Sequence, residues 1–369
     1  MIREVTRDVI VVGAGIIGCA VGRELARRGA KVRIFEARRI GAGATQASAG
    51  VLAPYIEAHD RGDLFTLTVR SLALYDQFVA DAARESGIAI EYRRCGTLEV
   101  ATDHAIAARL RQTEQTYRDD GVMRWLDGPD ARREEPALPD AIEGALYIAT
   151  HGYVAVPALT EALAWAALRH GAELETTDRV TAIRRDGEHL AVVTADGTVW
   201  PAAQVVIAAG SWTGQIATSG LPPDTVRPVR GQLLHLRWSG RALSHVIWGP
   251  DCYVVPWEDG TVLVGATVED VGFDERATAA GVRDLLDAVC ELLPEAWRAT
   301  FVEARVGLRP ATADGLPVIG RSETVPGLVY ATGHYRNGIL LAPLTAQLVA
   351  DFVIDGKEDP LLQRVRPRR

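Results

Sequence analysis

The 369-residue sequence has little sulfur: four cysteines and two methionines. No two of the cysteines (Cys19, Cys95, Cys252 and Cys290) are spaced as CxxC, and a chain of this size needs no disulfides to fold. Ligands of a metal site would have to cluster, and no such cluster is present, so no metal is predicted. Reduced thiols and a cytoplasmic location are the expectation.

A long apolar run and an excess of positive charge are also absent. The apolar stretch at residues 9–21 contains three glycines and is too short to cross a bilayer. No amphipathic basic helix suggests docking on a membrane surface. The formal net charge of −8 argues against nucleic acid as the main partner. We therefore expect neither a membrane protein nor a nucleic-acid-binding protein.

The N-terminal region has a strand–turn–helix–strand pattern. Residues 8–12 are a continuous apolar run of strand length, residues 19–28 have a helical pattern, and residues 32–35 are a second apolar run. Residues 13–18, between the first strand and the helix, are Gly-Ala-Gly-Ile-Ile-Gly. This order predicts parallel strands and a dinucleotide-binding fold.

Each glycine of that turn has a physical role. Gly13 permits the tight turn, Gly15 lets the backbone approach a pyrophosphate, and Gly18 lets the helix pack on the strand. Glu36, at the end of the second strand, can accept hydrogen bonds from ribose hydroxyls and would repel a 2′-phosphate. The alternatives are a glycine-rich turn in an unrelated α/β protein, and an NADP site that uses the arginines after Glu36.

The rest of the pattern suggests two domains. Helices are predicted over residues 64–85, 105–121, 157–170, 279–293 and 338–353. Short strands are predicted over residues 173–176, 180–184, 190–194, 198–200, 205–208 and 327–331, with a hairpin turn at Asp196-Gly197 and a strand-rich segment at 228–266. We predict a nucleotide-binding domain made of residues 1–85, 150–221 and 306–369, and a substrate domain made of residues 86–149 and 222–305.

Four segments resemble the glycine oxidase and D-amino-acid oxidase group, FAD-dependent amine oxidases that include the sarcosine oxidases: residues 9–18, 43–50, 205–214 and 333–343. The resemblance runs nearly end to end, and residues 307–343 are its most specific part. It implies an α/β fold in which a Rossmann-type FAD-binding domain carries an α+β substrate domain with an antiparallel sheet. It also implies noncovalent FAD, because no cysteine follows Cys290 to form the covalent link of some sarcosine oxidases.

The resemblance further implies which residues contact FAD. Those from Gly333 onward would form a loop and a helix start beside the isoalloxazine ring, where a helix N-terminus stabilises negative charge on the reduced flavin. The complete set is Gly13, Ala14, Gly15, Ile16, Ile17, Gly18, Glu36, Ala37, Arg38, Thr45, Ser48, Ala49, Gly50, Leu52, Val180, Ala209, Gly210, Gly333, His334, Arg336, Asn337, Gly338, Ile339 and Leu340.

An amino-acid substrate presents a carboxylate, which arginine binds best because its planar guanidinium makes two parallel charge-assisted hydrogen bonds. By the resemblance, Arg309 binds this carboxylate, Tyr253 donates a hydrogen bond to it, and Arg336 lies near substrate and flavin. From the residues alone, an arginine such as Arg309 is more often a surface or ion-paired residue. The corresponding alternatives are a half-buried strand tyrosine for Tyr253 and, for Arg336, a salt bridge that holds its loop.

Three positions depart from the family pattern near the substrate. Asp251 stands where histidine is expected, and Val51 and Val268 stand where methionine is expected. Valine is shorter and stiffer than methionine, so these changes bear on which substrate fits. Glycine, sarcosine and larger D-amino acids all remain open.

The implied reaction is oxidative deamination of glycine or another small amino acid. Hydride passes from Cα to flavin N5, water hydrolyses the imine to a keto acid and ammonia, and O2 is reduced to H2O2. The flavin carries the chemistry, so no catalytic side chain is predicted. The resemblance alone implies a role in forming the thiazole of thiamine. It also implies a homo-oligomer, for which a tetramer is the expected form. The alternatives are an oxidase or dehydrogenase of sarcosine or other N-methyl amino acids or of larger D-amino acids, and a noncatalytic FAD-binding subunit of a larger complex.

Overall fold

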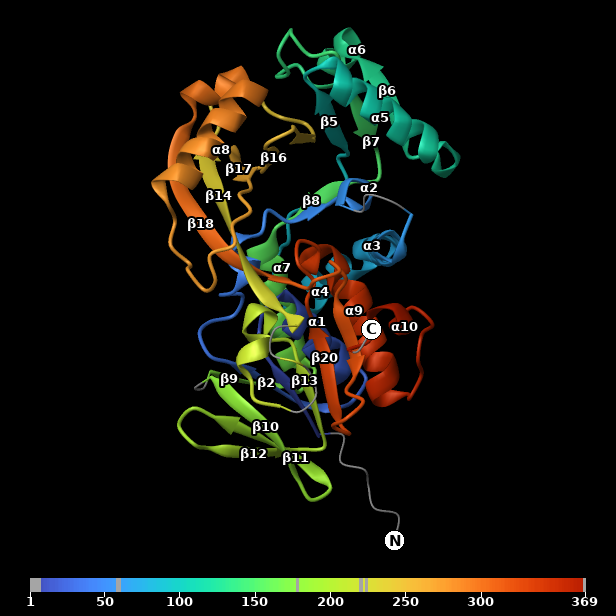
Figure 1. The fold of residues 1–369 in the computed structure, drawn as a ribbon, viewed down its shortest axis with the longest axis vertical. Helices are drawn as coiled ribbons and strands as arrows, with labels where there is room; N and C mark the ends of the chain where they lie inside the picture. Colours follow the sequence, from blue (N-terminus) through green and yellow to red (C-terminus); the bar gives the residue numbers. More distant parts are fainter. Residues whose placement is uncertain (1–7, 58–60, 177–178, 219–221, 223–224, 368–369) are drawn as a thin grey trace.

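The computed structural model describes residues 8–57, 61–176, 179–218, 222 and 225–367. Two large sheets organise the molecule, one in the lower half of Figure 1 and one in the upper half. Two long strands, β14 (Arg227–Arg237) and β18 (Thr300–Ala311), pair with each other in the upper sheet and extend toward the lower one. The site described below lies where the two halves meet.

The lower sheet has six strands in the order β19-β20-β13-β1-β2-β9. β1 lies between β2 and β13, and neighbouring strands are parallel apart from β19, which runs antiparallel to β20. This confirms the parallel sheet predicted from the N-terminal pattern. The strands are β1 (Asp8–Val12), β2 (Lys31–Glu36), β9 (Glu173–Thr176), β13 (Gln204–Ile207), β19 (Val318–Arg321) and β20 (Leu328–Thr332).

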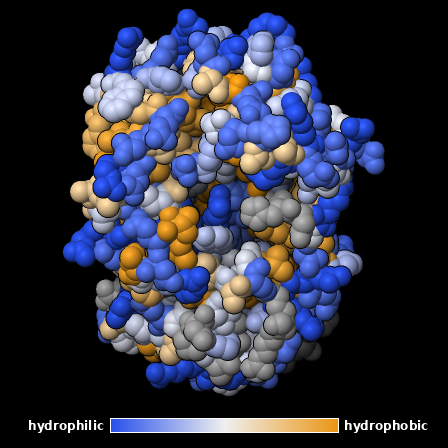
Figure 2. Space-filling model, turned by 45° about the horizontal axis from the view of Figure 1, so that its top comes forward, coloured by the Kyte–Doolittle hydropathy of each residue, from blue (hydrophilic) through white to orange (hydrophobic). Residues whose placement is uncertain are grey.

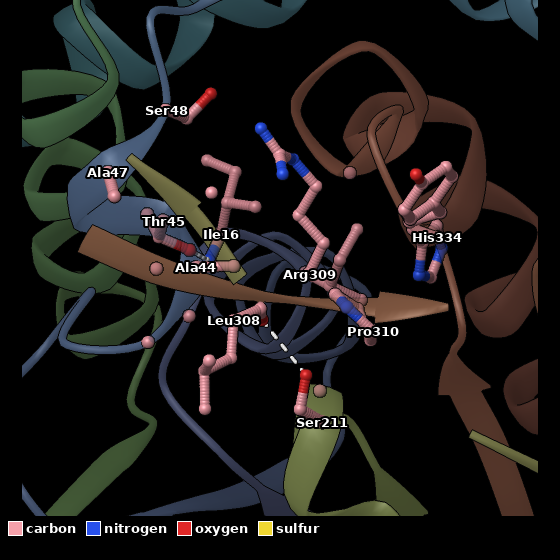
Figure 3. A pocket seen from close by; sticks show the side chains of 18 of the residues that line it. Ile16, Ala44, Thr45, Ala47, Ser48, Ser211, Leu308, Arg309, Pro310 and His334 are labelled. Atoms are coloured by element: carbon pink, nitrogen blue, oxygen red, sulfur yellow. Dashed lines mark hydrogen bonds between the residues drawn. The ribbon is translucent and has the colours of Figure 1, made fainter. Parts of the chain in front are cut away.

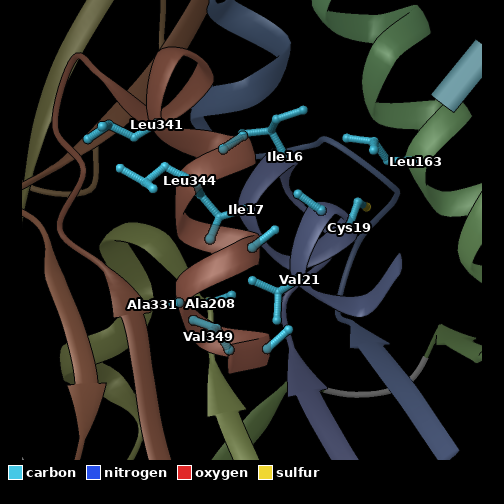
Figure 4. Close-up of a cluster of buried hydrophobic side chains, with 14 of the residues drawn as sticks. Ile16, Ile17, Cys19, Val21, Leu163, Ala208, Ala331, Leu341, Leu344 and Val349 are labelled. Atoms are coloured by element: carbon cyan, nitrogen blue, oxygen red, sulfur yellow. The ribbon is translucent and has the colours of Figure 1, made fainter. Parts of the chain in front are cut away.

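Both faces of this sheet are covered. On one face, α1 (Ile16–Arg27) packs between α7 (Val156–Arg169) and α9 (Gly338–Ile354), as Figure 4 shows around Ile17 and Val21. The other face is covered by the antiparallel strands β10 (Val180–Asp186), β11 (His189–Thr194) and β12 (Val199–Ala202). Side chains alternate along a strand, so the four buried positions of β1, residues 9–12, are all apolar between these two layers.

Two predicted helices differ from the structure. α1 begins at Ile16 rather than at residue 19, which places Gly18 inside the helix. The single helix predicted over residues 64–85 is wrong: α3 (Asp63–Ala73) and α4 (Tyr75–Ser86) meet at Leu74. The break lets both helices bond to α9, since Ser71 Oγ donates to the carbonyl of Leu340 and Tyr75 Oη to that of Ile339. Apolar periodicity alone did not reveal this break.

The upper sheet has eight strands in the order β18-β14-β17-β16-β15-β5-β7-β6, antiparallel except between β15 and β5. Its other strands are β5 (Thr97–Ala101), β6 (Met123–Asp127), β7 (Gly144–Ile148), β15 (Val246–Trp248), β16 (Tyr253–Pro256) and β17 (Thr261–Gly265). Helices α5 (His104–Thr116), α6 (Gly128–Glu134) and α8 (Ala279–Leu292) accompany it. The strand-rich interpretation of residues 228–266 is thereby confirmed.

Short elements complete the fold. They are β3 (Val51–Leu52), β4 (Tyr92–Arg93), β8 (Gly152–Val154), α2 (Pro54–Glu57), α10 (Leu362–Val365) and the 3-10 helices Ala44–Ala47, Arg118–Asp120, Gly210–Gln215 and Pro294–Arg298. In the described part of the chain, no helix is long and apolar enough to cross a membrane. Among the same residues, no three His, Cys, Asp or Glu side chains are grouped to hold a metal ion. The predicted domain boundaries stay a proposal.

Candidate active site

A cavity of about 1060 Å³ lies between the two sheets. Its walls extend from Glu36 and Val180 at one end, past Gly15 and Ser48, to Arg309 at the other. Cavities that hold small molecules and cofactors span about 300–1,000 Å³, so this one is slightly above that range. In the space-filling view the molecule is hollowed near its middle, with hydrophilic side chains deep in the hollow (Figure 2).

The glycines of the first turn leave no room for side chains. Gly13 has a φ of +107°, and a Cβ there would lie 2.6 Å from the carbonyl oxygen of Ala208. A Cβ on Gly18 would collide with the carbonyl oxygen of Gly13, so the helix packs on the turn at van der Waals distance. Gly15 is the N-cap of α1 and has no capping side chain. The N–H of Ile16 donates to the hydroxyl of Thr45 at 3.1 Å, and the positive end of the helix dipole at this start favours an anion such as a pyrophosphate.

The carboxylate of Glu36 is anchored by the backbone on both sides. One oxygen accepts from the N–H of Ala14 and the other from the N–H of Arg38, each at 2.8 Å. Each oxygen keeps a further lone pair for a ribose hydroxyl. The guanidinium of Arg38 forms an ion pair with Glu275 at 3.0 Å and lies 4.5 Å from the ring of Trp212. Arg38 is therefore already paired, and the carboxylate of Glu36 would repel a 2′-phosphate, so the site favours a dinucleotide without one.

The wall around the start of α9 carries polar groups in a buried setting. His334 is 3% exposed, and Nε2 lies 3.0 Å from the hydroxyl of Thr345. Burial lowers the pKa of His334 to about 3, so the imidazole is neutral at physiological pH. The amide oxygen of Asn337 is buried without a hydrogen-bond partner among the described residues, and the residue lines the cavity. An unsatisfied acceptor at an uncapped helix start fits a bound group that donates hydrogen bonds.

These features together suit FAD: glycines that admit a pyrophosphate, a carboxylate placed for ribose, and a polar pocket at the start of α9. Most of the residues predicted to contact the cofactor line this one cavity. The exceptions are Ala14, Gly18, Leu52, Gly333 and Leu340. Ala14 and Gly18 support the cavity indirectly. The N–H of Ala14 donates to Glu36, and Gly18 packs on Gly13.

Arg309 projects from β18 into the cavity, away from Leu308, whose carbonyl accepts from Ser211 (Figure 3). Nη1 donates to the carbonyl oxygen of Thr267 at 2.9 Å and to that of Arg230 at 3.3 Å. No carboxylate of the described residues forms an ion pair with it. Burial lowers its pKa, but a guanidinium stays charged in proteins. The site therefore holds a half-buried cation that lacks an anionic partner.

Tyr253 lies near Arg309 on β16. Its ring centroid is 4.9 Å from that of Trp248, and burial raises the pKa of its hydroxyl, which keeps the hydroxyl protonated and able to donate. Both residues lie over glycines. A Cβ on Gly231 would collide with the guanidinium of Arg309, and one on Gly265 would collide with the Tyr253 ring. Sequence reasoning missed these two glycines, which only the strand register places under the side chains.

Arg336 lines the same cavity but is already engaged. Nε and Nη2 each lie 3.1 Å from an oxygen of Glu57 on α2. This is the loop-holding salt bridge raised as an alternative from the sequence. Glu57 was not predicted as a site residue, although it is the only charged residue between positions 41 and 57. That isolation was the available signal.

The three departing positions also line the cavity. Asp251 is exposed, Val51 is half-buried, and Val268 is 59% exposed. Other lining residues that sequence reasoning missed include Trp212, Trp248 and Tyr335, the last with a φ of +48°. Aromatic walls and a strained backbone are common at binding sites.

Comparisons with known proteins agree with this geometry. The family model described as FAD dependent oxidoreductase matches residues 8–352. The glycine oxidase of Geobacillus kaustophilus is 38% identical over 94% of this chain and 92% of its own length. Its crystal structure superposes with a TM-score of 0.94, covering 98% of both chains. The iminodiacetate oxidase of Chelativorans sp. BNC1 gives a TM-score of 0.90 at 32% identity, covering 97% of this chain and 98% of its own.

A further relative is longer than this chain. The bifunctional protein ThiO/ThiG of Nostoc sp. is 35% identical over 97% of this chain. The match covers 54% of that protein, so the chain spans about half its length.

Proposed function

The chain belongs to the family of FAD dependent oxidoreductases, and on that premise we propose that it oxidises the amine of a small amino acid, glycine first among the candidates. One observation carries the proposal. Arg309, a cation without an anionic partner among the described residues, lies in the same cavity as the dinucleotide cradle. A carboxylate bound there is held close to the cofactor.

The residues would divide the work as follows. The fork of Arg309 binds the substrate carboxylate, and the hydroxyl of Tyr253 donates to one of its oxygens. Bound FAD supplies the acceptor for the hydride of the Cα–H bond. The packed rings of Tyr253 and Trp248 would shield the reacting carbon from water. The bound carboxylate would fix the orientation of Cα relative to the cofactor. No proton-transferring side chain is needed if the substrate amine binds neutral.

The relatives support glycine as substrate and a role in thiamine biosynthesis, through the glycine oxidase and the ThiO/ThiG proteins. We further propose O2 as the electron acceptor, noncovalent FAD, a homo-oligomer and a cytoplasmic location. The four free cysteines are consistent with a reducing compartment. Light scattering of the purified protein measures the oligomeric state directly.

N-substituted glycines are the second candidate class. The relative that oxidises iminodiacetate favours them, as do Val51 and Val268, which leave more room at the cavity wall than methionine would. Sarcosine belongs to this class. A noncatalytic FAD-binding subunit is disfavoured, because such a subunit needs no arginine and tyrosine aimed into the cofactor cavity.

The test is the visible absorbance of the purified protein under argon, before and after addition of glycine, sarcosine and a bulky D-amino acid. Bleaching of a yellow protein by glycine, followed by recovery in air, supports a glycine oxidase. If only sarcosine or only the D-amino acid bleaches the flavin, the protein is still an FAD-dependent amine oxidase or dehydrogenase, but its substrate is that compound rather than glycine. Failure of every amino acid to bleach the flavin overturns the proposed function.

A further inference from the structure

We propose that Glu57 sets the number of carboxylates that the substrate end of the cavity accepts. By holding the Nε/Nη2 edge of Arg336 and balancing its charge, it restricts the site to amino acids with one carboxylate. The inference rests on the proposed amine oxidation and names the substrate class and the residue that selects it.

The geometry begins with two guanidinium groups in one cavity. Arg309 meets only backbone carbonyls among the described residues. Arg336 instead turns its planar fork to Glu57, with Nε to one carboxylate oxygen and Nη2 to the other, both at 3.1 Å. Nη2 donates to Glu57 and Nε lies at ion-pair distance, so this edge of the guanidinium is occupied and its charge is balanced. A ligand carboxylate could reach only the remaining Nη1 edge of Arg336, beside a carboxylate that already balances the charge.

The charges point the same way. The Glu57 side chain is only 14% exposed, so its charge is weakly screened by solvent. Burial is the main cause that raises the pKa of Tyr253, and the negative charge of Glu57 contributes to the same shift. Its field therefore extends to the carboxylate-binding residues. Asp251 adds a second negative charge on the cavity wall.

A single carboxylate on Arg309 leaves this arrangement balanced, because Arg336 and Glu57 cancel each other. A second carboxylate would meet a neutralised arginine and two acidic groups. Glu57→Gln keeps the size of the side chain but removes its charge, which frees the Arg336 fork for a second carboxylate. Glu57 thus acts through Arg336, as a positioning residue for substrate charge.

The experiment compares sarcosine with iminodiacetate. Both are N-substituted glycines, and the substituent is a methyl group in sarcosine and a carboxymethyl group in iminodiacetate. Oxidation of iminodiacetate consumes one O2 and one water and yields glyoxylate, glycine and H2O2. We expect the wild-type enzyme to prefer sarcosine. In Glu57→Gln, the ratio of kcat/KM for iminodiacetate to that for sarcosine should rise by about tenfold or more, the factor that ~1.4 kcal/mol of charge interaction gives.

Two further variants separate charge from structure. Glu57→Asp keeps the charge and should keep the wild-type ratio. Glu57→Gln combined with Arg336→Met should lose the gain, because the fork that binds the second carboxylate is gone. The gain should also shrink as salt is added. A general structural defect would lower kcat/KM for both substrates and leave their ratio unchanged.

The outcomes distinguish the two proposals. If glycine bleaches the wild-type flavin but the ratio stays constant in Glu57→Gln, Glu57 does not select substrate charge and the oxidase function stands. If no amino acid bleaches the flavin, both proposals fall. If Glu57→Gln does not fold, inhibition of the wild-type enzyme decides. Malonate should inhibit no better than acetate, and tighter inhibition by malonate would overturn the inference.

Discussion

The dinucleotide end of the cavity is lined mostly by backbone, whereas the substrate end is lined by charged and aromatic side chains. At the first end, Gly13 and Gly15 bring main-chain atoms to the wall. At the second, the side chains of Arg309 and Tyr253 form the wall, and each packs against a glycine of a neighbouring strand. At the dinucleotide end, glycines leave space for the ligand itself. At the substrate end, glycines leave space for the side chains of Arg309 and Tyr253, which are proposed to contact the ligand.

The difference predicts distinct responses to substitution. Changes at the dinucleotide end should affect folding and FAD content, because the backbone there belongs to the core of the lower sheet. Changes at the substrate end should affect turnover while the flavin remains bound. Each variant below is therefore measured for both properties.

The largest effect is expected from Arg309→Ala. Loss of the charged partner of a bound carboxylate costs about 2–5 kcal/mol, so kcat/KM for glycine should fall by roughly one and a half to three and a half orders of magnitude. The visible flavin spectrum should stay as in the wild type. Steady-state oxygen consumption and the absorbance ratio of flavin to protein check both parts. Unchanged kcat/KM would remove Arg309 from the substrate site.

Gly18→Ala should show the opposite profile. The added methyl group collides with the carbonyl of Gly13, and overpacking of this kind costs about 1–3 kcal/mol. The melting temperature and the FAD content should fall, while the flavin-loaded fraction keeps its KM for glycine. Arg309→Ala is the matched control, since it leaves α1 intact. A rise in KM for glycine without loss of flavin would contradict the proposed division of roles.

Acid should weaken the fold through two buried histidines, His334 at the cavity and His151 under the upper sheet. Burial lowers the pKa of each from 6.5 to about 3. Between these values the unfolded state binds the proton and the folded state does not, so stability falls as pH falls. The slope is about 1.4 kcal/mol per pH unit for each histidine.

Urea unfolding at pH 7 and pH 5 measures this loss. Replacing either histidine with glutamine should reduce the loss between the two pH values, by a similar amount at the two positions. If the pH dependence is the same in His334→Gln as in the wild type, that imidazole is not held neutral.

The smallest effect is expected from Val51→Met. The longer side chain narrows the substrate end, so kcat/KM for a bulky D-amino acid should fall relative to that for glycine, by less than about tenfold. Val268→Met is the companion variant and should do less, because Val268 is 59% exposed. An equal loss for glycine and the bulky substrate would mean that position 51 does not set pocket size.

The two ends also differ in how far the sequence predicted them. The dinucleotide end follows from one contiguous pattern, in which Gly13, Gly18 and Glu36 lie within a single strand–turn–helix–strand unit. The substrate end joins α2, β16, β18 and the start of α9, so no local spacing relates Glu57 to Arg336. Family resemblance pointed to the arginines and the tyrosine. It did not reveal which arginine is paired, because an ion pair between distant segments depends on the packing of those segments.

Strand register explains the remaining omissions. Tyr253 is opposite Gly265 in the β16–β17 ladder, and Gly231 lies two positions along from the residue paired with Arg309. A one-residue shift in either ladder would place a different side chain beneath the site. The break at Leu74 was missed for a related reason, since α9 makes two short helices more favourable than one long helix.

The pairing of β1 with β13 and of β13 with β20 has a consequence for synthesis on the ribosome. Val9 is synthesised well before its partner Gln204, and Val205 well before its partner Leu328. Contacts between residues so far apart in the chain form slowly, and the nascent β1–α1–β2 unit exposes apolar faces until its partners arrive. A truncated chain released before β20 should therefore be a substrate for chaperones and proteases. The cavity is lined by residues from Val12 to Ile339, so FAD retention is expected only after the segment up to Ile339 has been synthesised.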